Sequence, residues 1–300
     1  MRIRSLENVL RQYEKISIIG HDNIDVDAIL SGILLSNLLD FLGIQNEFII
    51  LEEIKENESY KIVKELFGIN IEMYYTEREE SSRKFFLEDH YETKHLGEAV
   101  ACVDHHPNDR KKDYPFLYSR IACSTSYMVY ELMQEAGYEI SKLEAKMILV
   151  SMMIDTVSFR NGKTVYKEVD EAKRIAKRYN INYEELEKYC LCLTPIDKYS
   201  IAEIINNGYK YYQYNENRIK SSYIQIYGMV DRKFIEKCIL SIENAIQEEN
   251  IKMWVFIIFE CKDEITYEYH ITEKDVKLIK SNGILSRGTN IMPKIEKLFQ

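Results

Sequence analysis

The sequence predicts an α/β fold, with an N-terminal, mostly parallel sheet flanked by helices and a smaller C-terminal α/β domain. Two observations lead to this prediction. Short β-branched segments alternate with segments of helical apolar spacing through the first part of the chain, and the pattern changes after Cys192. Strands that alternate with helices form parallel sheets, because each helix carries the chain back to begin the next strand in the same direction.

The first predicted strand, 16–20, is a β-branched run that ends in glycine. The next segment, 27–42, has apolar residues at helical spacing and therefore predicts a helix. Further strands are predicted at 46–51 and 98–103. Later helices are predicted at 125–136, 142–153 and 168–179.

A second domain is predicted beyond a break at 193–197, which contains a proline. Strand-like runs follow at 220–227 and 253–260, with a helical pattern at 232–249 between them. A chain of 300 residues with 46% hydrophobic content can form two domains of ordinary size. We therefore expect domains at 1–192 and 193–300.

Composition excludes several classes of protein. The formal net charge of -9 provides no general attraction for a long nucleic acid, whereas a local cationic pocket could still bind a small phosphorylated substrate. The N-terminus lacks the apolar core of a signal peptide, and no stretch reaches the ~18 to 20 apolar residues of a membrane span. The six cysteines have no CxxC spacing, so neither a zinc ribbon nor a disulfide framework is indicated. We expect a soluble, cytoplasmic protein that is not associated with a membrane.

Three segments rich in metal-ligand residues carry the chemistry. The first follows the first predicted strand, the second follows the strand at 98–103, and the third ends an apolar helix. Open α/β sheets bind ligands at the carboxyl ends of their strands, so these side chains should meet. The candidates are His21, Asp25, Asp27, Asp104, His105, His106 and Asp155.

Several carboxylates in one cleft repel one another unless cations neutralise them. Mixed histidine and aspartate ligands suit Mn²⁺, Mg²⁺ or Co²⁺ better than structural zinc. Two such ions, about 3.5 to 4 Å apart, can generate a nucleophile and stabilise charge during attack at phosphorus. Side chains at i and i+2 of an extended loop point to opposite sides, so Asp25 and Asp27 are expected to face different ions.

Each residue alone also has a simpler interpretation. A single buried aspartate such as Asp155 is more often a helix cap or ion-pair partner, and a histidine pair is often packing. Asp104 could orient a neighbouring imidazole. The joint occurrence of the three segments in this order favours a two-metal phosphohydrolase.

The same residues resemble the DHH phosphoesterase superfamily, and within it the manganese-dependent (family II) inorganic pyrophosphatases and related exopolyphosphatases. The resemblance covers most of the chain. Residues 20–29 are similar to the first motif of the family, 103–106 to the segment that names the superfamily, and 151–159 to its fourth motif. The second motif places a metal-bridging aspartate at a strand end, and 87–90 fits that position.

The resemblance implies a role for each candidate. One ion would be held by His21, Asp25 and Asp89. The second would be held by Asp27, Asp89, His105 and Asp155, with Asp89 bridging the two. His106 would face the substrate phosphate and Asp104 would support the site. The ions would be Mn²⁺, with Mg²⁺ or Co²⁺ as alternatives.

The C-terminal domain resembles the substrate domain of these pyrophosphatases, which ends in a Ser-Arg-Lys-Lys-Gln type stretch that binds the phosphoryl groups. The corresponding stretch here keeps Arg287 but has Gly288 and Thr289 in place of the lysines. Ile24 also stands where the pyrophosphatases commonly have proline. Lys198 is a further candidate for binding substrate, although an exposed, solvated lysine is an equally good interpretation.

Inorganic pyrophosphate is therefore the first substrate expected from the resemblance, with Asp89, His106 and Arg287 as catalytic residues. Because each charge-assisted contact contributes about 1.5 to 3 kcal/mol, the loss of two lysines leaves other substrates open. The alternatives are a phosphodiesterase or exopolyphosphatase acting on short polyphosphate or small nucleotides, and a regulatory homologue without turnover. A homodimer is compatible with the sequence.

Overall fold

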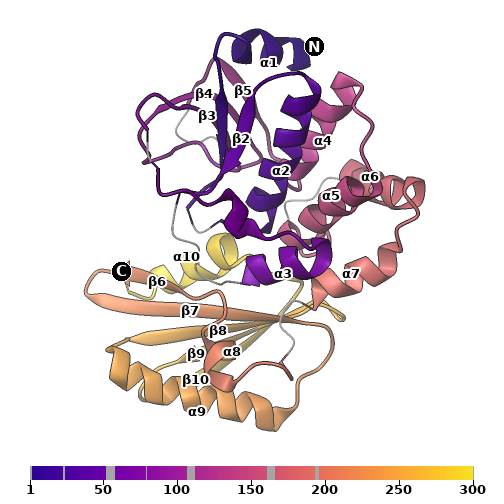
Figure 1. The fold of residues 1–300 in the computed structure, drawn as a ribbon. Coiled ribbons are helices and arrows are strands. Elements are labelled where there is room, and N and C mark those ends of the chain that lie inside the picture. Colours follow the sequence, from indigo (N-terminus) through magenta and orange to yellow (C-terminus); the bar gives the residue numbers. More distant parts are fainter. Residues whose placement is uncertain are drawn as a thin grey trace. The chain divides into compact units, whose positions relative to one another are not determined.

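The computed structural model describes residues 2–22, 24–51, 58–78, 80–106, 112–160, 166–192 and 196–299. The chain forms two compact units. The first comprises Met1–Phe159 and Lys163–Tyr183, and the second comprises Arg160–Gly162 and Glu184–Gln300. Figure 1 shows a separate sheet in each unit. The α/β fold predicted from the sequence is confirmed.

The sheet of the first unit is parallel, with the strand order β2-β1-β3-β4-β5. All four residues of β1 are buried, and so are the last four residues of β3. Strands that are covered on both faces consist of nearly continuous apolar runs, as these do. The strands are β1 (Ile16–Ile19), β2 (Asn46–Ile49), β3 (Lys84–Glu88), β4 (Glu98–Asp104) and β5 (Phe116–Ser119).

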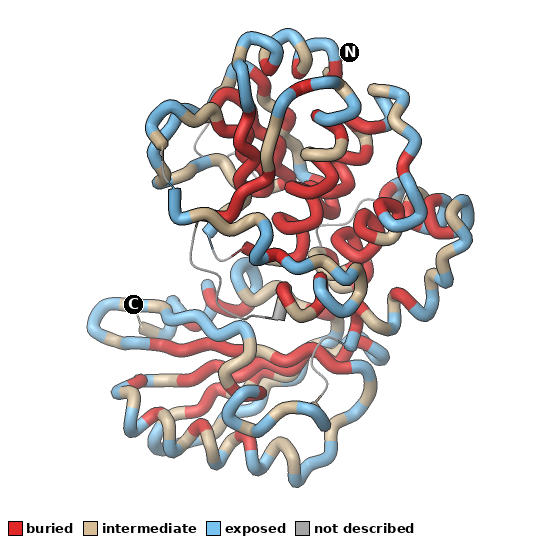
Figure 2. The backbone as a smooth tube through the Cα atoms, viewed as in Figure 1, coloured by how far each residue is buried: buried red, intermediate tan, exposed pale blue. Residues whose placement is uncertain are grey.

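Helix α2 (Val26–Phe41) is the central helix of the first unit and contacts β1, β2 and β3 on one side and two further helices, α4 and α5, on the other. Its residues from Val26 to Leu35 are all buried, and apart from Asp27 and Ser31 they are apolar or glycine. Figure 2 shows this burial as a continuous red segment beside the sheet. The helices of this unit are α1 (Arg2–Leu10), α2, α3 (Glu58–Phe67), the 3₁₀ turn Ile71–Tyr74, α4 (Thr125–Ala136), α5 (Lys142–Asp155) and α6 (Tyr166–Arg178).

The opposite face of the first sheet carries a second apolar cluster. Ile19, Ile49, Phe85, Leu87 and Cys102 form it, and loop residues pack over them. Side chains alternate between the two faces of a strand, so Phe86 and Glu88 point to the helical side while Phe85 and Leu87 point away from it. This alternation places Glu88 next to Ser31 of α2.

The second unit contains a mixed sheet with the order β10-β9-β8-β7-β6, in which only β7 and β8 pair in parallel among the described strands. Its strands are β6 (Lys210–Tyr214), β7 (Asn217–Ile226), β8 (Met253–Glu260), β9 (Ile265–Ile271) and β10 (Val276–Asn282). Its helices are α7 (Tyr183–Leu191, from Glu184 on), α8 (Ile201–Ile205), α9 (Arg232–Glu249), the π-helical turn Arg287–Ile291 and α10 (Met292–Glu296).

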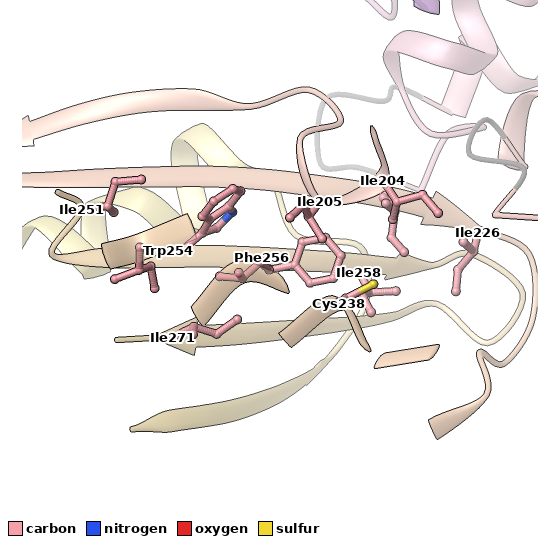
Figure 3. Packing of buried hydrophobic residues seen from close by; sticks show 12 residues of the cluster. Ile204, Ile205, Ile226, Cys238, Ile251, Trp254, Phe256, Ile258 and Ile271 are labelled. Atoms are coloured by element: carbon pink, nitrogen blue, oxygen red, sulfur yellow. The ribbon is translucent and has the colours of Figure 1, made fainter. Parts of the chain in front are cut away.

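The core of the second unit lies between this sheet and helices α8 and α9. Trp254, Phe256 and Ile258 alternate along β8 and pack against Cys238, Ile242 and Ile246 of α9, with Ile204 and Ile205 of α8 beside them. Figure 3 shows Trp254 and Phe256 on the same side of the sheet as Ile205 and Cys238. One amphipathic helix and one face of a sheet therefore form this core.

The predicted domain boundary between 192 and 193 falls where residues 193–195 lie outside the described part of the chain. The division at 1–192 and 193–300 therefore stays a prediction. Among the described helices, none is long and apolar enough to cross a membrane.

Candidate metal centre

Three neighbouring strands bring most of the predicted ligands to one edge of the first sheet. His21 lies two residues beyond β1, Asp89 directly follows β3, and His105 directly follows β4. Since β1, β3 and β4 are parallel and adjacent, their carboxyl ends meet. Asp155 is added from the last residue of α5.

Asp89 has an unusual backbone conformation for a residue other than glycine. Its φ of 62° is in the left-handed region, and its N–H donates to the carbonyl of Val103 at 3.0 Å. This conformation costs roughly 1 to 2 kcal/mol for most residues, and aspartate tolerates it better than most. The left-handed turn directs the Asp89 carboxylate across the strand ends, which is why strand periodicity alone did not indicate its position.

The two carboxylate oxygens of Asp89 face two different imidazoles. Its Oδ2 lies 3.5 Å from Nε2 of His21, and its Oδ1 lies 3.3 Å from Nε2 of His105. The Asp89 side chain is only 2% exposed. Asp89 therefore belongs to two separate groups of donor atoms.

The first group consists of His21, Asp25 and Asp89, whose donor atoms lie within 4.8 Å of one another. Nε2 of His21 is 3.6 Å from Oδ2 of Asp25, while its Nδ1 donates to the Asp22 carbonyl at 2.7 Å. Asp25 is the N-cap of α2 and accepts from the N–H of Ala28 at 3.1 Å. The extended loop expected around Asp25 and Asp27 is wrong, because Asp27 already lies in the first turn of α2. The helix start, not strand-like alternation, separates the two carboxylates.

The second group gathers around His105, which is buried. Its Nε2 lies 3.3 Å from Asp89, 3.7 Å from Oδ2 of Asp155 and 3.9 Å from Oδ2 of Asp27. Its Nδ1 donates to the carbonyl of Ala122 at 3.0 Å. A carbonyl accepts only, so this bond fixes the tautomer in which Nε2 is free to bind a cation.

His106 is oriented differently from His105. Oδ1 of Asp104 accepts from both Nδ1 and the main-chain N–H of His106, each at 2.9 Å. His106 also has a donor atom within 4.8 Å of donor atoms of Asp89 and His105, and its Nδ1 lies 3.7 Å from Oδ1 of Asp89. Its bond to Asp104 occupies that nitrogen, so the geometry leaves Nε2 of His106 for a ligand.

The carboxylates of the site attract positive charge strongly. Burial opposes protonation of His21, yet its bonds to Asp25 and Asp89 raise its pKa to about 12. In the same way Asp89, Asp155 and Asp27 raise the pKa of His105 to about 10 against the effect of burial. Burial, then the charge of Asp89, raises the pKa of Asp27 to about 7. Burial also opposes ionisation of Asp89, but the bonds from His105 and His21 hold its pKa below its ordinary value.

These residues fit divalent cations of intermediate hardness. The donors are imidazole nitrogens and carboxylate oxygens, and no cysteine belongs to the groups found among the described residues. Both His21 and His105 present Nε2 to the site, because Nδ1 of each donates to a main-chain carbonyl. Such mixed ligands suit Mn²⁺, Co²⁺ or Mg²⁺. A carboxylate shared by two groups is suited to a pair of ions about 3.5 to 4 Å apart.

The hydrogen bonds that hold the Asp27 carboxylate were not predicted from the sequence. Its Oδ2 accepts from the N–H of Thr125 at 2.7 Å, and its Oδ1 accepts from the N–H of Ser126 at 2.9 Å, the hydroxyl of Ser126 at 2.8 Å and the hydroxyl of Ser151. The run of three hydroxyl residues at 124–126 is typical of a helix start, and this was the available signal.

Lys198 and Arg287, the predicted substrate-binding residues, belong to the second unit. Lys198 is exposed. The guanidinium of Arg287 donates to the carbonyl of Gly208 and lies 5.2 Å from the ring centroid of Tyr223. Their roles in substrate binding stay predictions.

The fold and the clustered ligands define a class of protein that sequence comparison identifies. Residues 15–154, which include His21, Asp89 and His105, match the model for the DHH family, N-terminal domain. Over nearly its whole length the chain is similar to manganese-dependent inorganic pyrophosphatases. The predicted resemblance is confirmed.

Two such relatives show the extent of the similarity. The manganese-dependent inorganic pyrophosphatase of Methanocaldococcus jannaschii is 23% identical over 313 residues, which cover 94% of this chain and 98% of that protein. The "Probable manganese-dependent inorganic pyrophosphatase" of Enterococcus faecalis is 25% identical over 313 residues, which cover 95% and 99%.

Solved structures support the same fold. A Methanococcus jannaschii protein assigned to the family II inorganic pyrophosphatases matches with a TM-score of 0.66 at 21% identity, covering 95% of this chain and 99% of that one. An exopolyphosphatase-related protein of Bacteroides fragilis matches with a TM-score of 0.52 at 16% identity, covering 99% and 96%. At these identities the likeness concerns the fold.

Proposed function

We propose that this chain is a two-metal phosphohydrolase that converts inorganic pyrophosphate to two phosphates, with Mn²⁺ as the preferred ion. The observation that carries the proposal is the position of Asp89, whose two oxygens face His21 and His105. The similarity to proteins named manganese-dependent inorganic pyrophosphatase supports the choice of substrate and metal.

In this proposal each group of donors holds one ion. His21, Asp25 and Asp89 hold the first, and Asp27, Asp89, His105 and Asp155 hold the second. When bound, the two ions supply an activated water and neutralise the charge that develops at phosphorus. The chain itself fixes the positions of the ligands, through the carbonyls of Asp22 and Ala122 and through the start of α4.

His106 binds the phosphate of the substrate in this proposal. Burial lowers its pKa, but the hydrogen bond to Asp104 and the negative charges of Asp89 and Asp104 together raise it more, so the net shift is upward. The imidazole is 43% exposed, and Asp104 occupies its Nδ1. Its Nε2–H is therefore available to donate to a phosphoryl oxygen, where a charge-assisted hydrogen bond is favourable.

The second domain, proposed as 193–300, binds the leaving phosphate through Arg287 and Lys198. A glycine and a threonine at 288 and 289 provide fewer cations than two lysines would. Short polyphosphates and small nucleotides therefore remain the second group of substrates.

Phosphate release is the direct test. Wild type, Asp89→Ala and the control Asp170→Asn are assayed with Mn²⁺ against pyrophosphate, tripolyphosphate and small nucleotides. Asp170 is a suitable control because it is an exposed aspartate of α6 in the same unit and belongs to neither group of donors. We expect activity on pyrophosphate in the wild type and the control, and its loss in Asp89→Ala.

The substrate panel also decides between the alternatives. Faster turnover of a nucleotide or polyphosphate would replace pyrophosphate as the substrate while keeping the metal chemistry. If the wild type releases phosphate from none of these compounds, the enzymatic proposal is wrong and the regulatory homologue is supported.

A further inference from the structure

Thr125 contacts two carboxylates of the candidate metal centre with two different groups. Its main-chain N–H donates to Oδ2 of Asp27 at 2.7 Å, and its hydroxyl donates to Oδ1 of Asp89 at 2.8 Å. Thr125 is completely buried, as are Ser124 and Ser126 beside it. These two oxygens are the ones that face His105, at 3.9 and 3.3 Å. One residue thus connects two donors of the same cation position.

The ordinary role of a hydroxyl residue at a helix start does not explain the Thr125 side chain. Helix α4 spans Thr125–Ala136, and its N-cap is Ser124, whose hydroxyl accepts from the N–H of Tyr127 at 3.1 Å. The cap is therefore complete without Thr125. The hydroxyl of Thr125 instead has a partner outside the helix, Asp89, which directly follows β3 and is 36 residues away in sequence.

The first N–H groups of α4 also have a partner outside the helix. Such groups lack acceptors within a helix and carry partial positive charge. Here the Asp27 carboxylate accepts from the N–H groups of both Thr125 and Ser126. Asp27 is therefore held by the main chain of α4, and it keeps its place when a side chain of α4 changes.

Asp89 differs in this respect. The Asp89 carboxylate contacts the histidines of the site. Among the other described side chains, the hydroxyl of Thr125 is the donor that the structure shows for this carboxylate. The left-handed backbone sets the direction of Asp89, and the Thr125 hydroxyl sets the rotation of its carboxylate. Rotation decides whether each oxygen faces its own imidazole.

We infer that Thr125 is a positioning residue, which fixes the rotation of Asp89 relative to Asp27 and so sets the affinity for the second cation. The inference rests on the proposed function, because it assumes that these carboxylates hold metal ions. Residues that orient metal ligands in this way typically change affinity by about 10- to 100-fold when they are altered. Helix capping alone would not produce such an effect.

Three variants separate positioning from stability. Thr125→Val keeps the shape of the side chain but removes the donor, and Thr125→Ser keeps the donor. Ser124→Ala removes the helix cap and leaves the contacts to both carboxylates. Binding of Mn²⁺ alone is measured by the electron paramagnetic resonance of the free ion, and folding is measured by thermal unfolding.

We expect Thr125→Val to bind one of the two Mn²⁺ ions about 10- to 100-fold more weakly than the wild type. Thr125→Ser should bind close to the wild type. Ser124→Ala should melt at a lower temperature with unchanged Mn²⁺ affinity. If Thr125→Val does not fold, Thr125→Ala provides the same comparison with Thr125→Ser.

Two results would overturn the inference: wild-type affinity in the folded variant that lacks the hydroxyl, or equal loss of affinity in Thr125→Ser. Either result can be distinguished from a failure of the proposed function. If the proposed function is wrong, the wild type itself would bind fewer than two Mn²⁺ ions.

Discussion

Nε2 of His105 lies 3.3 Å from Oδ1 of Asp89, with both side chains 2% exposed. The imidazole reaches this position because its other nitrogen donates to the Ala122 carbonyl. The carboxylate reaches it because β3 ends in a left-handed turn. Two strand ends thus place a nitrogen and an oxygen donor together in a buried site, where a cation would replace the proton that His105 holds.

Glu88, the residue before Asp89, should make the metal-free protein less stable as the pH rises. It is fully buried, and burial followed by the charges of Asp89 and Asp27 raises its pKa well above the ordinary value. Its Oε2 accepts from Ser31, while Oε1 has no hydrogen-bond partner within the described structure. The folded state therefore holds the proton of Glu88 over a pH range in which the unfolded state releases it.

The direction of this pH dependence follows from the linkage between protonation and folding. A raised pKa in the folded state contributes stability below the ordinary pKa of glutamate, and this contribution is lost as the pH rises towards the folded pKa. Glu88→Gln stays neutral, so we expect it to unfold like the wild type near about pH 5 and to be more stable by about 1 to 3 kcal/mol near about pH 8. Urea unfolding in the presence of a chelator measures the difference. Equal pH dependence of the two proteins would contradict this explanation.

Arg287→Ala should weaken catalysis without affecting Mn²⁺ binding. The proposed contact to a phosphoryl group contributes about 1.5 to 3 kcal/mol, which corresponds to roughly 10- to 150-fold in kcat/KM. Steady-state kinetics with pyrophosphate and an Mn²⁺ titration measure the two effects. The matched control is Lys294→Ala, a basic residue of the neighbouring helix α10. Unchanged kcat/KM in Arg287→Ala would remove this residue from substrate binding.

Lys220 should stabilise the second unit specifically. It is 2% exposed, its Nζ donates to Oε1 of Glu249 at 2.9 Å, and it lies 3.9 Å from the ring centroid of Trp254. Lys220→Ala removes both interactions, and we expect a loss of about 1 to 3 kcal/mol of unfolding free energy. The chain has one tryptophan, so its fluorescence reports on this unit.

Lys277→Ala is the matched control for that measurement. Lys277 is an exposed lysine on β10 of the same sheet, and surface substitutions of this kind usually change stability by less than about 0.5 kcal/mol. An equally small effect of Lys220→Ala would show that the buried pair and the aromatic contact contribute little.

Much of the fold was predictable because its signals are local. The β-branched run at 16–20 and the mostly apolar helix that follows it were identified, since burial on both faces leaves a nearly continuous apolar pattern. Helix α1, with its arginines and a glutamate, was not predicted, although Leu6 and Leu10 bury its apolar face. The strand β5 is short, with alternating burial over four residues, and gave too little pattern to identify.

In the candidate site, too, residues with a local sequence signal could be predicted and those without one could not. The residues His21, Asp25, Asp27, His105 and Asp155 stand beside recognisable strands and helices, so their meeting could be predicted from parallel strand ends. Asp89 required the resemblance, because its position depends on a left-handed turn. The contacts of Thr125 and Ser126 to Asp27 could not be predicted, since they join residues about 100 positions apart in the chain.

The most direct test of the central claim is the number of Mn²⁺ ions bound by the wild type and by Asp89→Ala. Because the two oxygens of Asp89 face two donor groups, we expect two ions per chain in the wild type at saturation. We expect weakened binding at both positions in Asp89→Ala, with Asp170→Asn still binding two. A wild type that binds fewer than two ions, or an Asp89→Ala protein that binds two with unchanged affinity, would contradict the central claim.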